Sequence, residues 1–222
     1  MRAPHGRPPI VAMVLGAGGL ALVVLPLVGL VWRAPWGSVG DALREPVVAA
    51  ALRLSIVCSL SATAVAVVLG VPLAWVLART PFPGRRLVRS AVLVPLVLPP
   101  VVGGVALLLA FGRRGLLGQY LDAWFGIRLP FTTAGAALAE AFVAMPFLVV
   151  TAEAAFRNLD RRFEDAARTL GASRWRVFRT VTLPLARPSL AAGAVLAWAR
   201  AVGEFGATIT FAGNTPRRTT TI

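Results

Sequence analysis

Long apolar stretches constrain the fold of this chain more than any other feature of its sequence. A transmembrane helix needs about 20 apolar residues to cross the bilayer core. In lipid, backbone polar groups must be satisfied within their own segment, and these stretches lack the alternation of apolar and polar residues that a barrel strand requires. We therefore predict an all-α fold, a polytopic bundle of transmembrane helices. The five predicted spans are Ile10–Trp32, Val47–Ala78, Leu87–Phe111, Phe131–Val150 and Leu190–Ala212.

The first predicted span could be mistaken for a secretory signal, because Arg2 and Arg7 precede it. Its apolar run is longer than the roughly 7–15 residues of a signal core, and Pro35 and Trp36 follow where a small-residue cleavage site would be needed. We therefore interpret it as a transmembrane helix. Residues 1–46 then hold an N-terminal tail, this helix and an external loop, and residues 47–222 form the main transmembrane domain.

The formal net charge of +14 would suggest a nucleic-acid partner in a soluble protein, but here the basic residues gather in loops between spans. Cytoplasmic loops of membrane proteins carry an excess of basic residues. The loops at 79–89 and 157–187 hold more than half of them, so we predict that both loops and the N-terminal tail face the cytoplasm, with membrane lipid and no nucleic acid around the chain. The predicted outer segments also carry arginines, namely Arg113, Arg114, Arg217 and Arg218.

The chain lacks residues that several kinds of chemistry need. All 23 basic residues are arginine, so there is no lysine for the P-loop that binds ATP phosphates. Cys58, the single cysteine, lies in a predicted span, and His5, the single histidine, lies in the N-terminal tail. A disulfide within one chain, a thiolate metal cluster and Ser-His catalysis are therefore excluded. We predict no catalytic and no metal-binding residues.

Two places within the predicted spans are candidates for a translocation path or gate. The first is Pro99-Pro100 in the third span, where adjacent prolines remove backbone donors and interrupt a regular helix. Broken backbone at membrane depth is tolerated where it is buried in protein or lines a cavity. A translocation path and a purely structural break both fit this pattern.

The second place is the last span, where Arg200 and Glu204 stand one helical turn apart. Opposite charges at this spacing neutralise each other, and charges within a membrane usually face the bundle interior. Gly203 and Gly206 fit a close approach of helices. The pair marks either an interior polar cluster or a gate. Glu140 in the fourth span is a weaker candidate, with a protonated or paired structural glutamate as the alternative.

The loop at about 152–188 is predicted to form a helix-turn-helix. Apolar residues recur at i, i+3, i+4 and i+7 from Phe163 to Leu170, which gives one apolar helical face. Gly171 suits the end of this helix, and the second helix is expected to end at Leu183-Pro184. A polar, arginine-rich hairpin of this kind is typical of a docking surface. The predicted docking residues are Glu164, Asp165, Ala166, Ala167, Gly171, Leu183 and Pro184.

The spacing in this loop resembles the EAA loop of ABC-importer permeases, in which Glu-Ala-Ala is followed after three residues by Gly and after nine more by Ile-x-Leu-Pro. Here three residues separate Asp165-Ala166-Ala167 from Gly171, and nine separate Gly171 from Val181-Thr182-Leu183-Pro184. The departures are Asp165 for the glutamate, with Glu164 beside it, and Val181 for the isoleucine.

Further segments resemble the membrane permeases of bacterial molybdate ABC importers, in the wider molybdate/sulfate group, over most of 47–222. The Gly-Glu-Phe-Gly-Ala block that starts at Gly203 narrows the resemblance to oxyanion permeases. Its continuation, Thr208-Ile209-Thr210-Phe211, is more similar to molybdate than to sulfate permeases. The other matching segments are Pro95–Val102, Gly112–Gly115, Ala166–Ala172 and Ala212–Asn214.

The resemblance implies a permease subunit that carries molybdate into the cytoplasm and is not itself an enzyme. It implies a homodimer in the bacterial inner membrane, docked through the 165–184 loop on a dimer of a separate cytoplasmic ATPase. That ATPase would bind ATP and Mg, and an extracytoplasmic molybdate-binding protein would deliver the anion. No cofactor is expected in this chain. Gly171 would allow the turn of the loop, and Leu183 and Pro184 would fix its return.

Other interpretations make different demands on the sequence. Sulfate or thiosulfate, and then tungstate, are alternative substrates because these dianions share a tetrahedral shape. A channel or a secondary anion transporter would also carry prolines and a charge pair in its spans, but it would not need the hairpin. A membrane-bound enzyme would need clustered His, Cys or paired carboxylates. Family members continue beyond Thr221-Ile222 with a further loop and span, so we expect a C-terminally incomplete chain.

Overall fold

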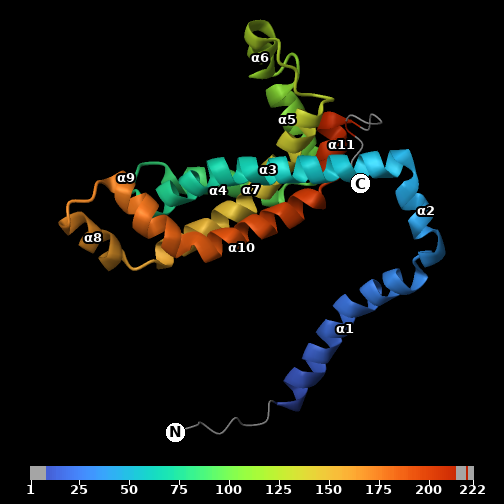
Figure 1. Ribbon diagram of the computed structural model, residues 1–222, viewed down its shortest axis with the longest axis horizontal. Helices are drawn as coiled ribbons and strands as arrows, with labels where there is room; N and C mark the ends of the chain where they lie inside the picture. Colours follow the sequence, from blue (N-terminus) through green and yellow to red (C-terminus); the bar gives the residue numbers. More distant parts are fainter. Residues whose placement is uncertain (1–8, 214–218, 220–222) are drawn as a thin grey trace. The chain divides into compact units, whose positions relative to one another are not determined.

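The computed structural model describes residues 9–213 and Thr219, and within this part of the chain it contains helices and no strands (Figure 1). Contacts divide the chain into two units, Met1–Pro46 and Val47–Ile222. The predicted N-terminal tail, with Arg2, His5 and Arg7, lies outside the described residues, as do Asn214, Arg217 and Arg218. The elements are α1 Ile10–Arg33, η1 Trp36–Ser38, α2 Val39–Arg44, α3 Pro46–Arg79, α4 Arg85–Val97, α5 Pro100–Phe111, α6 Gly118–Phe125, α7 Thr133–Asn158, α8 Arg161–Thr169, α9 Arg174–Val177, η2 Phe178–Thr182, α10 Leu183–Val202 and α11 Gly206–Ala212.

Four helical stretches among the described residues are long and apolar enough to cross a membrane. They are Ile10–Arg33, Pro46–Arg79, Thr133–Asn158 and Arg174–Val202, and Pro100–Phe111 is a shorter apolar helix. In the first unit, α1 is apolar along its whole length and none of its residues is buried. A helix that is apolar on all sides is typical of a membrane span. The chain is therefore a multi-pass, all-helical membrane protein.

The core of the second unit lies where α3, α7 and α10 pack together, and small side chains form most of it. Ala62 and Ala66 of α3, Ala144 of α7 and Ala197 of α10 have no exposed surface. An added Cβ on Gly193 of α10 would lie 3.1 Å from Leu148 of α7. Because lipid offers no hydrophobic driving force between helices, small residues and the close packing that they permit hold such bundles together.

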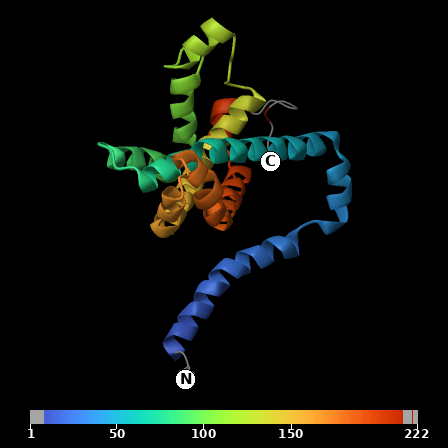
Figure 2. The same cartoon turned by 60° about the vertical axis from the view of Figure 1, so that its left-hand side comes forward.

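The third predicted span, Leu87–Phe111, is not one helix. Its first half is α4, which ends at Val97, and its second half is α5, which begins at Pro100. Leu98 and Pro99 between them have extended backbone, with ψ of 133° and 135°. The break is therefore at the prolines, as the sequence predicts. In both views α5 runs across the direction of α3 rather than along it (Figures 1 and 2).

The fifth predicted span, Leu190–Ala212, is not one helix either, and here the sequence did not predict the break. The helix α10 begins earlier, at Leu183, and ends at Val202, and the short helix α11 follows from Gly206. The cause is local. The side chain of Glu204 accepts a hydrogen bond of 2.7 Å from the backbone N–H of Ala207, in the first turn of α11. A side chain that satisfies such an N–H lets a new helix start.

Candidate functional site

The predicted hairpin is present, with α8 as its first helix and α9 as the start of its second. Asp160 caps α8, because its carboxylate accepts a hydrogen bond of 2.9 Å from the N–H of Arg162. At the other end the N–H groups of Gly171 and Ala172 donate to the carbonyls of Arg168 and Ala167, the paired bonds of a Schellman motif. Gly171 has φ +82°, the left-handed conformation that this motif requires.

The second helix does not end at Leu183-Pro184, and that prediction was wrong. A π-helical turn, η2, connects α9 to α10, so the chain stays helical from Arg174 to Val202. Pro184 lies in the first turn of α10, directly after η2. A proline is tolerated there because the π turn changes the hydrogen-bonding pattern of the preceding residues. The hairpin therefore continues into a membrane-spanning helix as one helical stretch.

The helix α8 has its apolar face outward and a carboxylate inward. Phe163 is 58% exposed and Leu170 is 89% exposed, whereas Glu164 is 8% exposed and is the one buried residue of the helix. The predicted apolar face is thus present, but it does not pack on the rest of the chain. Charged groups are rarely buried without partners, and large apolar side chains gain most when they are covered. This arrangement is typical of a helix whose apolar face is covered by another protein.

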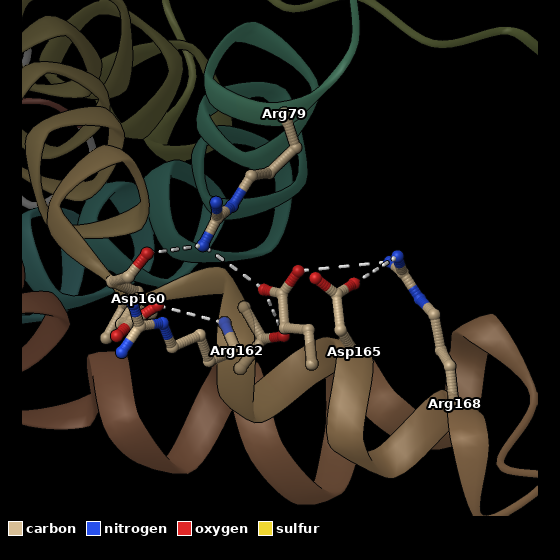
Figure 3. Close-up of polar contacts among 8 residues, drawn as sticks. Arg79, Asp160, Arg162, Asp165 and Arg168 are labelled. Carbon is tan, nitrogen blue, oxygen red and sulfur yellow. Dashed lines mark hydrogen bonds and ion pairs between the residues drawn. The ribbon is translucent and has the colours of Figure 1, made fainter.

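Three groups surround the buried carboxylate of Glu164, and two of them come from outside α8. The Thr182 hydroxyl donates to Oε1 at 2.9 Å, and Nη2 of Arg79, the last residue of α3, lies 3.2 Å from the same oxygen. Arg168 Nη2 is 3.9 Å from Oε2. Figure 3 shows Arg79 reaching from α3 toward α8, where it also donates to the carbonyl of Leu159, the C-cap of α7, at 3.2 Å.

Asp165, which stands at the position of the glutamate in the EAA pattern, has a different environment from its neighbour. Its side chain is 64% exposed, and its one ion pair within the described residues is with Arg168, at 3.3 Å on the same helix. A surface ion pair of this kind contributes little to stability. Asp165 is therefore accessible to a partner, whereas Glu164 is not.

A cavity of about 450 Å³ lies between the hairpin and the end of α3. Four arginines line it, together with two acidic residues and several apolar side chains. Trp75 of α3 and Phe178 of η2 meet edge to face there, with ring centroids 5.5 Å apart. The charged residues of the lining are Arg79, Arg161, Arg168, Arg174, Glu164 and Asp165.

The two candidate places for a translocation path or gate lie against each other. A Cβ added to Gly206 of α11 would lie 2.8 Å from Cβ of Pro100, the first residue of α5. The predicted close approach is therefore found at Gly206. At Gly203 the nearest atom to an added Cβ is 3.6 Å away and belongs to the same helix, so no other helix approaches there. The broken ends of the third and fifth predicted spans thus meet, and Pro99 immediately precedes this contact.

Arg200 and Glu204 form the ion pair that their spacing predicts, with Nη2 and Oε2 2.5 Å apart. The Glu204 side chain is 1% exposed and the Arg200 side chain 28%. Two other buried oxygens, Oε2 of Glu140 on α7 and Oγ1 of Thr208 on α11, lack a hydrogen-bond partner among the described residues. The Arg200–Glu204 pair is therefore formed with a buried carboxylate, and its role, as part of an interior polar cluster or as a gate, stays a prediction.

The segment between α5 and α7 is held by an ion-pair cluster on Asp122. Arg128 Nε lies 2.8 Å and Arg113 Nε 3.1 Å from its carboxylate oxygens. The hydrogen bond from Arg128 is the main reason that the pKa of Asp122 is lower than usual, and Arg113 adds to the effect. Arg113 therefore has a partner within the chain.

The partners of Glu164 could not be found from the sequence. Arg79 was recognised only as part of a basic loop, and Thr182 only as the variable position of the Val-x-Leu-Pro motif. Both are far from Glu164 along the chain, and no local pattern indicates that three helices meet at one carboxylate. The tertiary fold brings them together.

The sequence of this helical bundle matches a family of transport proteins. Residues 66–222 match the family described as "Binding-protein-dependent transport system inner membrane component". The chain belongs to this family. It is thus an inner-membrane component of a transport system.

Particular relatives within this family are similar to most of the chain. The "Molybdenum transport system permease protein ModB" of Mycobacterium tuberculosis is 47% identical over 88% of this chain and 74% of its own length. The protein of the same name from Escherichia coli K12 is 49% identical over 76% of this chain and 75% of its own length. The "Sulfate transport system permease protein CysT" of Salmonella typhimurium is 39% identical over 87% and 70% of the two chains.

A solved structure has the same fold. It is described as a bacterial ABC transporter involved in the import of the acidic polysaccharide alginate, and the TM-score is 0.63 with 18% identity over 85% of this chain and 71% of that one. At this identity the likeness concerns the fold alone. It supports the all-helical ABC-permease architecture that the sequence predicts.

Proposed function

We propose that this chain is the membrane-spanning permease of an ATP-driven importer that carries molybdate into the cytoplasm. The observation that carries the proposal is the higher identity to the molybdenum permeases, 49% for the Escherichia coli protein, than to the sulfate permease, 39%. Sulfate is the second candidate because the two oxyanions share shape and charge. Selection between them falls largely to the binding protein that delivers the anion.

The outward apolar face of α8 is the site at which the permease meets its ATPase. Phe163, in the first turn of α8, and Leu170, at its C-cap, are exposed on a hairpin rich in arginine, so the partner offers a groove with an apolar floor and an acidic rim. The accessible carboxylate of Asp165 and the backbone of Ala166 and Ala167 lie on the same helix. The protein that covers this face is a dimer of a separate cytoplasmic ATPase. Binding of ATP and Mg falls to that ATPase, because the permease has no lysine with which to form a P-loop.

The complete importer contains further partners. Two copies of the permease form a homodimer in the lipid of the bacterial inner membrane, with the hairpins and the N-terminal tail in the cytoplasm. An extracytoplasmic molybdate-binding protein docks on the opposite side. Closure of the ATPase dimer moves both hairpins, and this movement switches the permease between inward-open and outward-open states. The chain contributes movement and a path, and no chemistry.

The continuous helix from α9 to α10 supports this coupling. A displacement of α9, the second helix of the hairpin, passes directly along α10 to Arg200 and the break at Gly203, because no loop lies between α9 and α10. The interior contact between Gly206 and Pro100 lies just beyond that break. The moving element therefore ends at the residues that we assign to the translocation path.

The test is uptake of radiolabelled molybdate by membrane vesicles that contain the permease, its ATPase and its binding protein. We expect uptake that needs ATP, persists when ion gradients are dissipated, and resists excess unlabelled sulfate while excess unlabelled molybdate abolishes it. Equal competition by sulfate would move the assignment to the sulfate permeases. Uptake that follows an ion gradient and is indifferent to ATP would contradict the importer mechanism and favour a secondary transporter.

A further inference from the structure

We propose that Glu164 is a positioning residue that fixes the hairpin to two membrane-spanning helices, so that α8 cannot move without α3 and α10. This inference rests on the proposed function, since it concerns how movement of the ATPase reaches the membrane. The group of contacts, Glu164 with Arg79 and Thr182, is called the hairpin latch below. It differs in position and exposure from Asp165, the residue that the EAA pattern emphasises.

The geometry of the latch joins elements that the backbone does not hold rigidly. Residues 159 and 160 link α7 to α8, and 170–173 link α8 to α9, so backbone alone leaves α8 as a short helix between two turns. One oxygen of Glu164 receives both Nη2 of Arg79, at 3.2 Å, and the hydroxyl of Thr182, at 2.9 Å. Arg79 ends α3, and Thr182 immediately precedes α10. The carboxylate therefore fixes α8 to both spans.

Burial makes these contacts consequential. The side chains of Arg79 and Glu164 are 8% and 10% exposed. Removal of one member of a buried ion pair leaves the other charge without compensation, whereas an exposed pair is screened by water and contributes little. The ion pair of Asp165 with Arg168 is of the second kind. The two adjacent carboxylates thus have different roles. Glu164 contacts the membrane-spanning helices, and Asp165 is accessible to the ATPase.

The π turn explains how Thr182 comes to the latch. The wider turn of η2, from Phe178 to Thr182, is unusual in a helix, and such turns occur often at functional sites. The Thr182 side chain is buried there, although it belongs to a helix whose first turns carry Arg174, Arg176 and Arg179. Thr182 thus contributes its hydroxyl, as a hydrogen-bond donor to the buried carboxylate of Glu164, and not only its volume.

The experiment compares transport with ATP hydrolysis in the same vesicles, which contain permease, ATPase and binding protein. The quantity is labelled molybdate taken up per phosphate released. A role in stability alone would reduce uptake and hydrolysis together, because fewer complexes form, and would leave this ratio unchanged. A latch transmits movement, so its loss lets the ATPase turn over without transport.

We expect Glu164→Gln and Arg79→Gln each to lower the ratio by roughly fivefold to tenfold, within the range of coupling changes that single substitutions cause. The double variant should be no worse than either single one, because both changes break the same contact. Thr182→Val should lower the ratio by a smaller factor. Thr182→Ser keeps the hydroxyl and should have the same ratio as the unchanged chain. Glu45→Gln, the same chemical change at an exposed residue of the first unit, is the control.

A ratio that stays at the value of the unchanged chain in both Glu164→Gln and Thr182→Val would overturn the latch. If Glu164→Gln prevents assembly with the ATPase, the comparison of Thr182→Val with Thr182→Ser decides. A lower ratio of uptake to hydrolysis in Thr182→Val than in Thr182→Ser supports the latch, and equal ratios in the two variants refute it. Failure of the proposed function is separate, since the unchanged chain itself would then show no ATP-dependent molybdate uptake.

Discussion

At the scale of single residues, the left-handed backbone of Gly171 connects local geometry to coupling. We predict that Gly171→Asp abolishes most ATP-driven molybdate uptake, because a side chain at φ +82° strains the turn by about 1–2 kcal/mol and displaces Leu170 from its exposed position. The measurements are labelled uptake in vesicles and the thermal unfolding midpoint of the purified complex. No atom lies within 4 Å of an added Cβ at Gly171, so strain and not a clash is the cause.

Gly84 provides a matched control for this prediction. It has φ +80°, no atom within 4 Å of an added Cβ, and a place in the other basic loop. Gly84→Asp should therefore lower the unfolding midpoint by a similar amount and leave the uptake per complex intact. Equal loss of uptake in both variants would mean that the effect of Gly171→Asp is general destabilisation, and would count against a specific role of the hairpin.

At the scale of elements, α5 and α11 can approach closely because Gly104 of α5 has no side chain. A Cβ on Gly104 would lie 2.6 Å from Cβ of Thr210 on α11, whereas a Cβ on the neighbouring Gly103 would make an ordinary contact of 3.4 Å with the ring of Phe142. We predict that Gly104→Ala destabilises the permease by about 1–3 kcal/mol, the usual range for overpacking. Gly103→Ala should change the unfolding midpoint little, and a larger effect from Gly103→Ala would contradict the packing described here.

Elements also show where prediction from sequence succeeds and where it fails. The break at Pro99 and the turn at Gly171 follow from the residues themselves, because proline removes a donor and glycine permits a positive φ. The end of a helix at Pro184 was predicted by the same rule and was wrong, since the preceding π turn accommodates the ring. The break at Glu204 was missed because it depends on the Glu204 side chain accepting a hydrogen bond from Ala207, in the first turn of the helix that starts at Gly206.

The candidate functional site, like the helices, was predictable from the sequence only in part. The docking face of α8 has a periodic signal, so its apolar residues were identified, but periodicity does not say whether a face points inward or outward. The burial of Glu164 reverses the usual arrangement, and it depends on Arg79 and Thr182 from other helices. Contacts between residues distant along the chain leave no mark in a single sequence.

At the scale of the whole molecule, the arginine distribution predicts which segments face the cytoplasm. Cys58 is the single cysteine and is buried, so new cysteines can be labelled against a silent background. We predict that a membrane-impermeant maleimide modifies Leu116→Cys in intact cells and Leu170→Cys only in inverted vesicles; both leucines are strongly exposed in the chain. Labelling of both from one side would contradict this topology.

Central to this account is the claim that a cytoplasmic ATPase covers the outward face of α8. The most direct measurement is the rate of maleimide labelling of Leu170→Cys in inverted vesicles, with and without the ATPase, with the exposed Arg86→Cys of the other basic loop as control. We predict that the ATPase slows labelling at position 170 by about tenfold or more and leaves position 86 unchanged, as full burial in an interface implies. Unaltered labelling of Leu170→Cys in a complex that still hydrolyses ATP and imports molybdate would contradict the claim.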